Sequence, residues 1–191
     1  MSERTTIRRH AERAAPKEAQ EFLARGLVAH VGFVQAGQPF VIPLTYHYDP
    51  ARPDRLYLHG SPEGRMQKHL ASGAPVCITV TTVKGLVYSR AAASHAVNYE
   101  SVVCFGRAHA VTDPEVKAAL FERMVARYHP GRTAGRDYAP ATPEQLARVS
   151  VVEVEIEEMS AKARRGGPMD PLDADPAAPG TSGVREIQYP L

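Results

Sequence analysis

Apolar and polar residues alternate along much of this chain, which is the pattern of a β-strand with one solvent-exposed face. The alternation is clearest in Ser150–Met159, where valines and an isoleucine stand between glutamates. Five further β-rich runs precede this segment. They are two runs within Leu27–Tyr48, on either side of the turn signal Ala36-Gly37-Gln38, and then Arg55–Gly60, Pro75–Arg90 and Ala96–Val111. The pattern therefore predicts six strands.

Four segments beside these runs carry helix signals. The strongest is Asp113–Pro130, which has an aspartate cap, a proline in the first helical position and the spacing LxxxMxxxY. The others are Pro16–Gly26, Gly64–Ser72 and Thr142–Val149. A crossover helix has no room between the first two strands or between the fourth and fifth, which excludes a parallel α/β sheet. We expect a mainly β fold, a small antiparallel barrel with peripheral helices.

The length of 191 residues suits one domain with extensions. We expect an N-terminal arm with a short helix over residues 1–26 and the barrel over residues 27–158. Residues 159–191 form a third part, in which nine of 33 residues are proline or glycine. This C-terminal arm is either disordered or an ordered arm that needs a ligand or a partner subunit to bury it.

Composition narrows the class of protein. The chain has 43% apolar and 23% charged residues and a net charge of +2, so nothing demands a nucleic acid. It has no run long enough to cross a membrane and no apolar signal segment, and we expect a cytoplasmic protein. Cys77 and Cys104 lie in apolar runs and are expected to be buried thiols. The eight histidines lack metal-ligand spacing, so no metal site is expected. His30 is interpreted as a structural residue on a strand.

The junction YLHGSPEGRMQKHL brings small residues and cations together where a strand gives way to a helix. Gly60, Ser61 and Gly64 would allow a ligand to approach the backbone, and the helix start offers free amides. Arg65 can bind oxygens in a bidentate manner, and Lys68 shares its helix face. The junction fits a phosphate site, and it equally fits a loop with solvated cations. It matches neither the P-loop nor the dinucleotide fingerprint.

Several blocks of the sequence resemble a known family. They are GQPFVIPLTYHYD, LYLHGSPEGRMQKHLASGAPVCITVT, GLVYSRAAASHAVNYESVVCFGRA and SAKARRGGPMD, and they span about Leu27–Asp170. Together these blocks resemble the pyridoxamine 5′-phosphate oxidase-like, FMN-binding split-barrel proteins. Within that family they are most similar to the flavin-nucleotide-binding branch, which includes the nitroimidazole-resistance proteins. The resemblance implies a six-stranded antiparallel split β-barrel that forms a homodimer, with two FMN molecules in clefts shared between the subunits.

The resemblance also implies the cofactor-binding residues. The phosphate would be held by His59, Gly60, Ser61, Gly64 and Arg65, with Lys68 nearby. The flavin ring would lie on Pro43, Leu44 and Thr45, and Asn98, Tyr99 and Ser101 would approach from the partner subunit. Lys162 and Arg164 are candidates for a cation near the N1 pole of the ring, although a basic run is also typical of solvated surface. His47 and His59 are expected to converge near the cofactor.

One departure from the family concerns the C-terminal arm. Many relatives carry a tryptophan where this chain has Thr181-Ser182-Gly183-Val184, which weakens the case for a flavin lid there.

Two functions follow from the resemblance. The first is an FMN-dependent oxidoreductase that takes electrons from NADH or NADPH and passes them to a small acceptor such as a nitroaromatic compound; FAD in place of FMN is also compatible. The flavin would carry the chemistry, so no catalytic side chains are identified. The alternative is a non-catalytic module that binds flavin, heme or a deazaflavin in the same cleft. Oxidation of pyridoxamine phosphate itself is less expected, because the C-terminal end lacks a strong basic substrate-phosphate site.

Overall fold

The computed structural model describes residues 2–188. Its strands are β1 (Val28–Gln35), β2 (Gln38–Tyr48), β3 (Arg55–Gly60), β4 (Pro75–Tyr88), β5 (Ala96–Val111), β6 (Ser150–Arg164) and β7 (Gly183–Glu186). Its helices are α1 (Ala19–Arg25), α2 (Arg65–Leu70), α3 (Pro114–Tyr128), α4 (Pro143–Ala147) and α5 (Pro171–Ala174). Short 3-10 turns cover η1 (Glu3–Thr5), η2 (Ala11–Arg13), η3 (Pro16–Glu18) and η4 (Ala92–Ser94).

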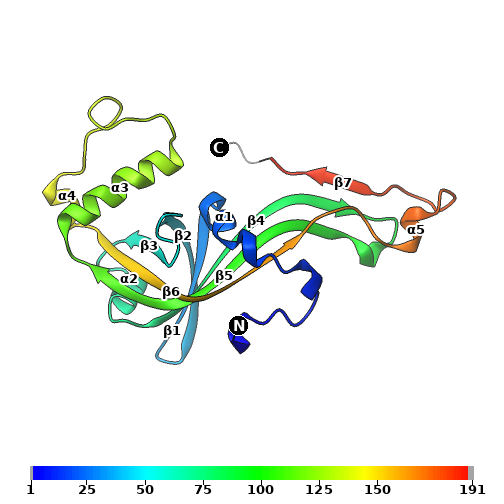
Figure 1. Ribbon diagram of the computed structural model, residues 1–191, viewed down its shortest axis with the longest axis horizontal. Coiled ribbons are helices and arrows are strands. Elements are labelled where there is room, and N and C mark those ends of the chain that lie inside the picture. The colour runs from blue at the N-terminus through cyan, green and yellow to red at the C-terminus, as the bar shows by residue number, and fades with distance from the viewer. Residues whose placement is uncertain (1, 189–191) are drawn as a thin grey trace.

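The sheet closes on itself. Its strand order is β1-β2-β3-β6-β5-β4-β7, and an additional pairing of β1 with β4 joins the first six strands into a ring. Each of these strand pairings is antiparallel. The predicted six-stranded antiparallel split barrel with peripheral helices is therefore confirmed (Figure 1).

Three strands continue beyond the ring. In Figure 1, β4, β5 and β6 run on as a long curved ribbon away from the barrel, and β7 follows the edge of β4. β6 extends to Arg164, past the expected end at Met159. β7 and α5 were not expected from the sequence, because a four-residue strand held at one edge by backbone hydrogen bonds needs no apolar periodicity. Much of the C-terminal arm is thus ordered along the barrel's own strands.

The core fills the barrel and extends to α1. Its fully buried side chains include Tyr46, Leu56, Leu58, Ile78, Val102 and Val152. α1 adds Phe22 and Leu23 to the same cluster, and the Tyr46 hydroxyl donates a hydrogen bond to the Leu23 carbonyl (2.5 Å). Cys104 is a buried free thiol, as expected, whereas Cys77 is only half-buried. No helix among residues 2–188 is long and apolar enough to cross a membrane.

The helix caps follow the sequence signals. Asp113 accepts hydrogen bonds from the amides of Glu115 and Val116 at the start of α3, and Thr142 forms a capping box with Gln145 at the start of α4. α3 lies over a second, smaller apolar cluster of Tyr57, Leu120 and Val151. The strong helix signal in the sequence therefore produces a helix that covers one side of β3 and β6.

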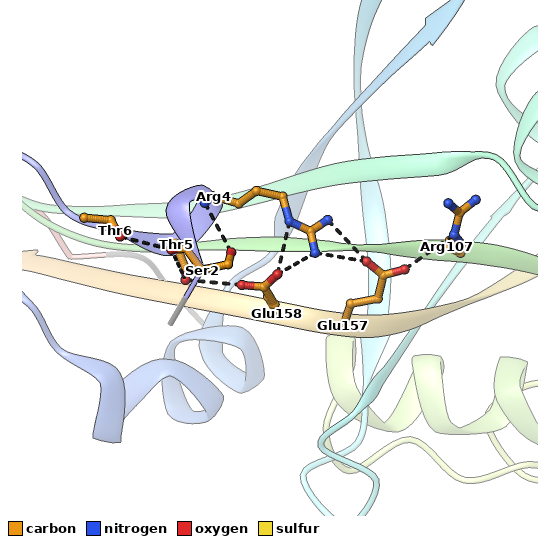
Figure 2. Close-up of polar contacts among 7 residues, drawn as sticks. All are labelled: Ser2, Arg4, Thr5, Thr6, Arg107, Glu157 and Glu158. Carbon is orange, nitrogen blue, oxygen red and sulfur yellow. Dashed lines mark hydrogen bonds and ion pairs between the residues drawn. The ribbon is translucent and has the colours of Figure 1, made fainter.

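The N-terminal arm is held against β6 by charged side chains (Figure 2). Arg4 forms ion pairs with Glu157 (3.2 Å) and Glu158 (2.5 Å), and the side chain of Thr5 is buried beside them. Further along, the Lys162 ammonium donates a hydrogen bond to the Arg9 carbonyl (2.7 Å). These contacts fix the path of residues 2–14 over the extended strands.

Candidate functional site

The predicted phosphate site is a tight turn that joins β3 to α2. The Gly64 amide donates a hydrogen bond to the Ser61 carbonyl (2.9 Å), and a Cβ on Gly64 would come within 3.0 Å of that oxygen. A Cβ on Gly60 would lie 3.2 Å from the Gln67 side chain. The small residues of this turn are therefore explained by its own close packing, whether or not a ligand also uses the space.

The two cations of the turn differ in their contacts. Lys68 forms an exposed ion pair with Glu63 (2.5 Å). The Arg65 guanidinium lies over the Phe40 ring, 4.4 Å from its centre, and has no ion-pair partner within the described part of the chain. A cation stacked on an aromatic face keeps its N–H groups available to an anion. Arg65 is thus the better placed of the two to bind a phosphate.

His59 and His47 do not belong to this turn. The His59 ring faces α3 and contacts Phe121 edge-on at 5.5 Å, whereas Gly60 faces α2. His47 is paired with Tyr57 in the ladder between β2 and β3 and is only 5% exposed. Both ring nitrogens of His47 and Nδ1 of His59 are buried without a hydrogen-bond partner among the described residues. The two histidines therefore lie near one another on the side of the sheet that α3 covers, His47 buried and His59 half-buried.

These buried histidines make stability depend on pH. Burial, with the nearby Arg127 charge as a second cause, lowers the pKa of His47, and burial alone lowers that of His59. The unfolded chain, with a histidine pKa near 6.5, therefore binds more protons than the folded chain as the pH falls below about 6.5. The stabilisation is complete above that pH and is lost as the pH falls toward the folded-state pKa.

Replacement of His47 tests this linkage. We expect His47→Leu to flatten the pH dependence of the free energy of unfolding and to gain about 1 kcal/mol over the wild type at pH 5.5, because it removes unpaired buried nitrogens. Urea unfolding at pH 7.5 and 5.5 measures both quantities. His129→Leu, at an exposed position after α3, is the control and should keep the wild-type slope. Equal slopes for wild type and His47→Leu would contradict the assignment.

Pro43 and Thr45 lie on the outside of the barrel. Pro43 pairs with His30 and Thr45 pairs with Val28 across β1 and β2, and all four are exposed. Leu44 points the other way and packs against the core. Val34 and Val41 are also exposed, at 58% and 67%. We call the surface made by Val28, His30, Val34, Val41, Pro43 and Thr45 the outer face.

The main cleft begins beside the outer face. It has a volume of about 820 Å³, and Val28 lies at its edge. Its walls come from the end of α1, from β4 and β5, from the turn after β6 and from β7 with the residues that follow it. The lining residues are Arg25, Leu27, Val28, Thr81, Thr82, Lys84, Asn98, Glu100, Arg165, Gly166, Val184, Glu186, Ile187 and Gln188. Of the residues expected to bind the cofactor, only Asn98 is among them.

A charged network spans the floor of the main cleft. Glu100 accepts from Arg25 (2.9 Å) and from Arg165 (3.3 Å), and Arg165 also pairs with Glu18 (2.5 Å). No spacing in the sequence predicted this network. The one signal in the sequence was Glu100, which lies on the same face of β5 as Val102 and Cys104. A carboxylate on a buried face requires charged or hydrogen-bonding partners, so this position predicts that some exist. Lys84 also lines the cleft and forms no ion pair within the described residues.

The cations expected near the flavin ring are already engaged. Arg164 is buried and donates to Asn98 Oδ1 (2.5 Å) and to the carbonyls of Gly166 (3.3 Å) and Gly167 (3.1 Å). Burial lowers its pKa from the usual value. Asn98 in turn donates to the Gly166 carbonyl (3.0 Å), and Lys162 holds the N-terminal arm. These three side chains therefore hold the backbone around the main cleft, which Asn98 also lines.

One chain does not bring the two halves of the predicted site together. Ser101 donates to the Lys162 carbonyl (3.3 Å), and Tyr99 is on the extended part of β5. The phosphate turn lies at the other end of the sheet, where Gly60 pairs with Ser150 and the next residue of β6, Val151, pairs with Val111. With a rise of about 3.3 Å per residue, roughly 33 Å of β5 separates Ser101 from that level. Within one chain, Asn98, Tyr99 and Ser101 therefore do not lie beside the turn.

Comparison with known proteins gives a consistent result. The family described as Pyridoxamine 5′-phosphate oxidase matches residues 15–163. Among solved structures, a flavocytochrome from Azotobacter vinelandii is 33% identical with a TM-score of 0.85, over 100% of this chain and 86% of that one. A FAD- and heme-binding protein from Mycobacterium smegmatis is 28% identical with a TM-score of 0.78, over 93% of this chain and 86% of that one.

A more distant structure supports the fold alone. A putative 5-nitroimidazole antibiotic resistance protein from Bacteroides thetaiotaomicron is 22% identical with a TM-score of 0.60, over 91% of this chain and 88% of that one. A search of curated proteins found no match. The resemblance drawn from the sequence blocks is therefore confirmed at the level of family and fold.

Proposed function

Because the chain belongs to the pyridoxamine 5′-phosphate oxidase family, we propose that it binds a flavin and works as a flavin-dependent redox protein. The observation that carries this proposal is the main cleft beside the outer face. Its volume of about 820 Å³ lies in the range of cofactor sites. Pro43 and Thr45 offer uncharged surface next to it, on which an aromatic ring system can lie.

The proposed flavin runs along the outer face from the turn to the main cleft, which Val28 and Lys84 line. Its phosphate would lie at the turn of Gly60, Ser61 and Gly64, where Arg65 forms charge-assisted hydrogen bonds and Lys68 adds positive charge nearby. Its ring would lie along Pro43–Thr45. Tyr99 and Ser101 of the partner subunit would complete the site. Asn98 of the partner subunit would contribute indirectly, because its hydrogen bond to the Gly166 carbonyl fixes the turn after β6. His59 is left out of this arrangement, because its ring faces α3.

A homodimer is part of this proposal. The outer face exposes Val28, Val34 and Val41, and a run of exposed apolar side chains on neighbouring strands is typical of a surface that another protein covers. A second copy placed there would bury the valines and bring β5 of one subunit to the turn of the other. The two symmetric clefts would then each contain residues of both subunits.

A bound flavin would supply hydride and single-electron transfer. The chain's own part is to hold the ring and to place charge near it. Lys84, the lysine of the main cleft without an ion pair in the described chain, would stabilise negative charge at the pyrimidine pole of the ring. This assignment replaces Lys162 and Arg164, whose donors are engaged. We propose NADH or NADPH as the electron donor and a small oxidised compound, such as a nitroaromatic, as the acceptor.

The identity of the nucleotide follows from one measurement. The sequence blocks favour FMN, whereas the Mycobacterium smegmatis relative is described as binding FAD and heme. The absorption spectrum of the purified protein, followed by chromatography of the nucleotide that heat releases, distinguishes FMN, FAD and a deazaflavin. A protein that binds the nucleotide but oxidises neither NADH nor NADPH with a panel of acceptors would be a binding module and not an enzyme.

Arg65→Ala is expected to weaken flavin binding about tenfold to a hundredfold, because a charge-assisted hydrogen bond to phosphate contributes about 1.5–3 kcal/mol. Fluorescence quenching of added FMN and FAD measures the dissociation constant. Arg148→Ala, at an exposed arginine after α4, is the matched control and should bind as the wild type does. If Arg65→Ala binds flavin with unchanged affinity, the flavin phosphate does not bind at this turn. A wild-type protein that takes up neither nucleotide would overturn the proposed function.

A further inference from the structure

A second cleft lies on the extended strands, apart from the outer face. Its volume is about 540 Å³. Three segments distant in the sequence form its walls: the N-terminal arm around η2, which is blue in Figure 1, the segment from η4 into β5, and the turn between β6 and α5. The lining residues that matter below are Arg13, Val97, Tyr99, Arg164, Met169 and Asp170. Of these, the flavin placement proposed above uses only Tyr99, which it assigns to the other subunit's site.

The Arg164 guanidinium at this cleft is a buried charge without a counter-ion in the described chain. Arg164 is 7% exposed, and it donates only to uncharged acceptors, the Asn98 amide oxygen and the carbonyls of Gly166 and Gly167. It forms no ion pair with a carboxylate within residues 2–188. Burying a charge is costly unless an opposite charge offsets it, and buried charges in proteins are usually paired. An anion that enters the cleft would offset this charge.

A second guanidinium lies near the first. Arg13 lines the same cleft, and both arginines, with Met169, also line a smaller cleft of about 340 Å³. Burial and, as a second cause, the nearby Arg13 charge lower the pKa of Arg164, so the two like charges repel each other. Arg13 contacts Glu12 only loosely, at 3.6 Å, and the same Glu12 oxygen also lies 3.1 Å from His10 Nδ1. An anion bound between the two arginines would relieve their repulsion.

The backbone that follows Arg13 is held against β6. Ala14 forms a bridge with Lys162, and the Ala15 amide donates a hydrogen bond to the Ala161 carbonyl (2.9 Å). The Arg13 side chain is itself only 21% exposed. Because this side chain is already restricted, binding an anion costs it less conformational entropy than a freely solvated arginine would lose.

The nearest acidic side chains of the two clefts have partners of their own. In the second cleft, the Asp170 carboxylate accepts a hydrogen bond from the Ser94 hydroxyl (2.6 Å). In the smaller cleft, Glu18 pairs with Arg165 at 2.5 Å. The positive charge at the junction of the two clefts therefore remains available to a ligand.

The rest of the wall fits an apolar body. Met169 is 75% exposed and Val97 is 38% exposed. Large exposed apolar side chains around a concave site indicate a ligand that covers them. Tyr99 pairs with Arg164 across β5 and β6, which places the two side chains next to one another. The Tyr99 ring extends the apolar wall, and a phenol hydroxyl can donate a hydrogen bond to a carboxylate.

We propose that this second cleft binds a small organic carboxylate with an apolar body. Arg13 binds the carboxylate through charge-assisted hydrogen bonds, the buried Arg164 charge attracts it, and Val97 and Met169 cover its apolar part. Inorganic phosphate matches the two guanidiniums but leaves the apolar wall exposed, so the carboxylate is the better fit. The inference goes beyond the proposed function and does not depend on it, because neither arginine holds the flavin.

Isothermal titration calorimetry of the full chain with benzoate tests the proposal, with flavin content measured in the same samples. Benzamide supplies the ring without the charge, acetate supplies the charge without the ring, and inorganic phosphate is the third comparison. We expect benzoate to bind about tenfold or more tightly than each of these three. Equal binding of benzamide would show that the cleft does not select an anion. Phosphate or acetate bound as tightly as benzoate would contradict the apolar part of the assignment.

Variants locate the ligand. Arg13→Gln should weaken benzoate binding about tenfold or more, because it removes a charge-assisted hydrogen bond. Arg148→Gln, at an exposed arginine after α4, is the matched control and should bind as the wild type does. Met169→Gln changes an exposed side chain and should weaken benzoate binding but not acetate binding, which keeps the test decisive if Arg13→Gln does not fold. Benzoate that binds both Arg13→Gln and Met169→Gln with wild-type affinity would lie outside this cleft.

This proposal and the flavin proposal fail separately. Arg65→Ala should lose flavin affinity and keep benzoate binding, whereas Arg13→Gln should lose benzoate binding and keep its flavin. A wild type that binds flavin but no benzoate would overturn the carboxylate proposal and leave the flavin proposal standing. A wild type that binds benzoate through Arg13 but takes up no flavin would overturn the proposed function alone.

Discussion

Gly106→Ala is expected to destabilise the protein by about 3 kcal/mol or more, or to prevent folding. Gly106 lies in β5 where the register with β6 shifts between Phe105 and Gly106. A Cβ at this position would lie 1.9 Å from the Glu155 carbonyl oxygen and 2.9 Å from its carbon. Both atoms are backbone, so no rotamer change relieves the overlap. The two longest strands of the barrel would have to separate locally.

Urea unfolding of Gly106→Ala against Gly167→Ala isolates this effect. Gly167 lies in the turn after β6, where a Cβ would meet no heavy atom within 4 Å and where φ is not positive. Both variants add the same methyl group and remove the same backbone freedom from the unfolded chain. We expect Gly167→Ala to match the wild type within about 0.5 kcal/mol. Equal stabilities of the two variants would show that the backbones of β5 and β6 do not approach each other closely at Gly106.

Arg164→Met is expected to cost about 2–4 kcal/mol, because it leaves several buried acceptors without a donor. The Arg164 guanidinium donates to Asn98 Oδ1 and to the carbonyls of Gly166 and Gly167. Methionine has a similar volume and fills the space, so packing alone changes little. The loss would therefore report the hydrogen bonds that fold the turn after β6.

The same variant should loosen the main cleft. Gly166 lines this cleft and follows Arg164 in the turn. Limited proteolysis should cut Arg164→Met after β6 faster than the wild type. Arg148→Met, at an exposed arginine, is the control for both assays and should behave as the wild type does. Wild-type stability in Arg164→Met would mean that the turn does not depend on these hydrogen bonds.

Local signals in the sequence predicted the elements that local chemistry determines. The alternation in Ser150–Met159 belongs to β6, and the aspartate, proline and fourfold spacing around residues 113–128 belong to α3 with Asp113 as its cap. The turn between β1 and β2 occurs at Ala36 and Gly37, both with positive φ. These features depend on residues close together in the chain, where side-chain type and spacing decide the backbone conformation.

Side-chain partners across the sheet were not predictable in the same way. Arg164 and Lys162 were interpreted as one basic run, yet one is buried against Asn98 and the other holds the N-terminal arm. Residues two apart on a strand face the same side, so the different surroundings of these two side chains depend on which distant segments lie over that side at each position. Glu100 and Arg25 illustrate the same point, since 75 residues separate them in the chain.

The sequence by itself determined that this chain is a six-stranded antiparallel split barrel of the pyridoxamine 5′-phosphate oxidase family, because strand periodicity, turn residues and family blocks are local properties. Only the tertiary structure decided which polar side chains are buried or hydrogen-bonded and which remain available to a ligand. It placed His47 and His59 beneath α3, engaged Lys162 and Arg164, laid the C-terminal arm along β4, and brought Arg13 and Arg164 to one cleft. Each of these results depends on strand register and closure of the ring, which bring together residues that no spacing in the sequence relates.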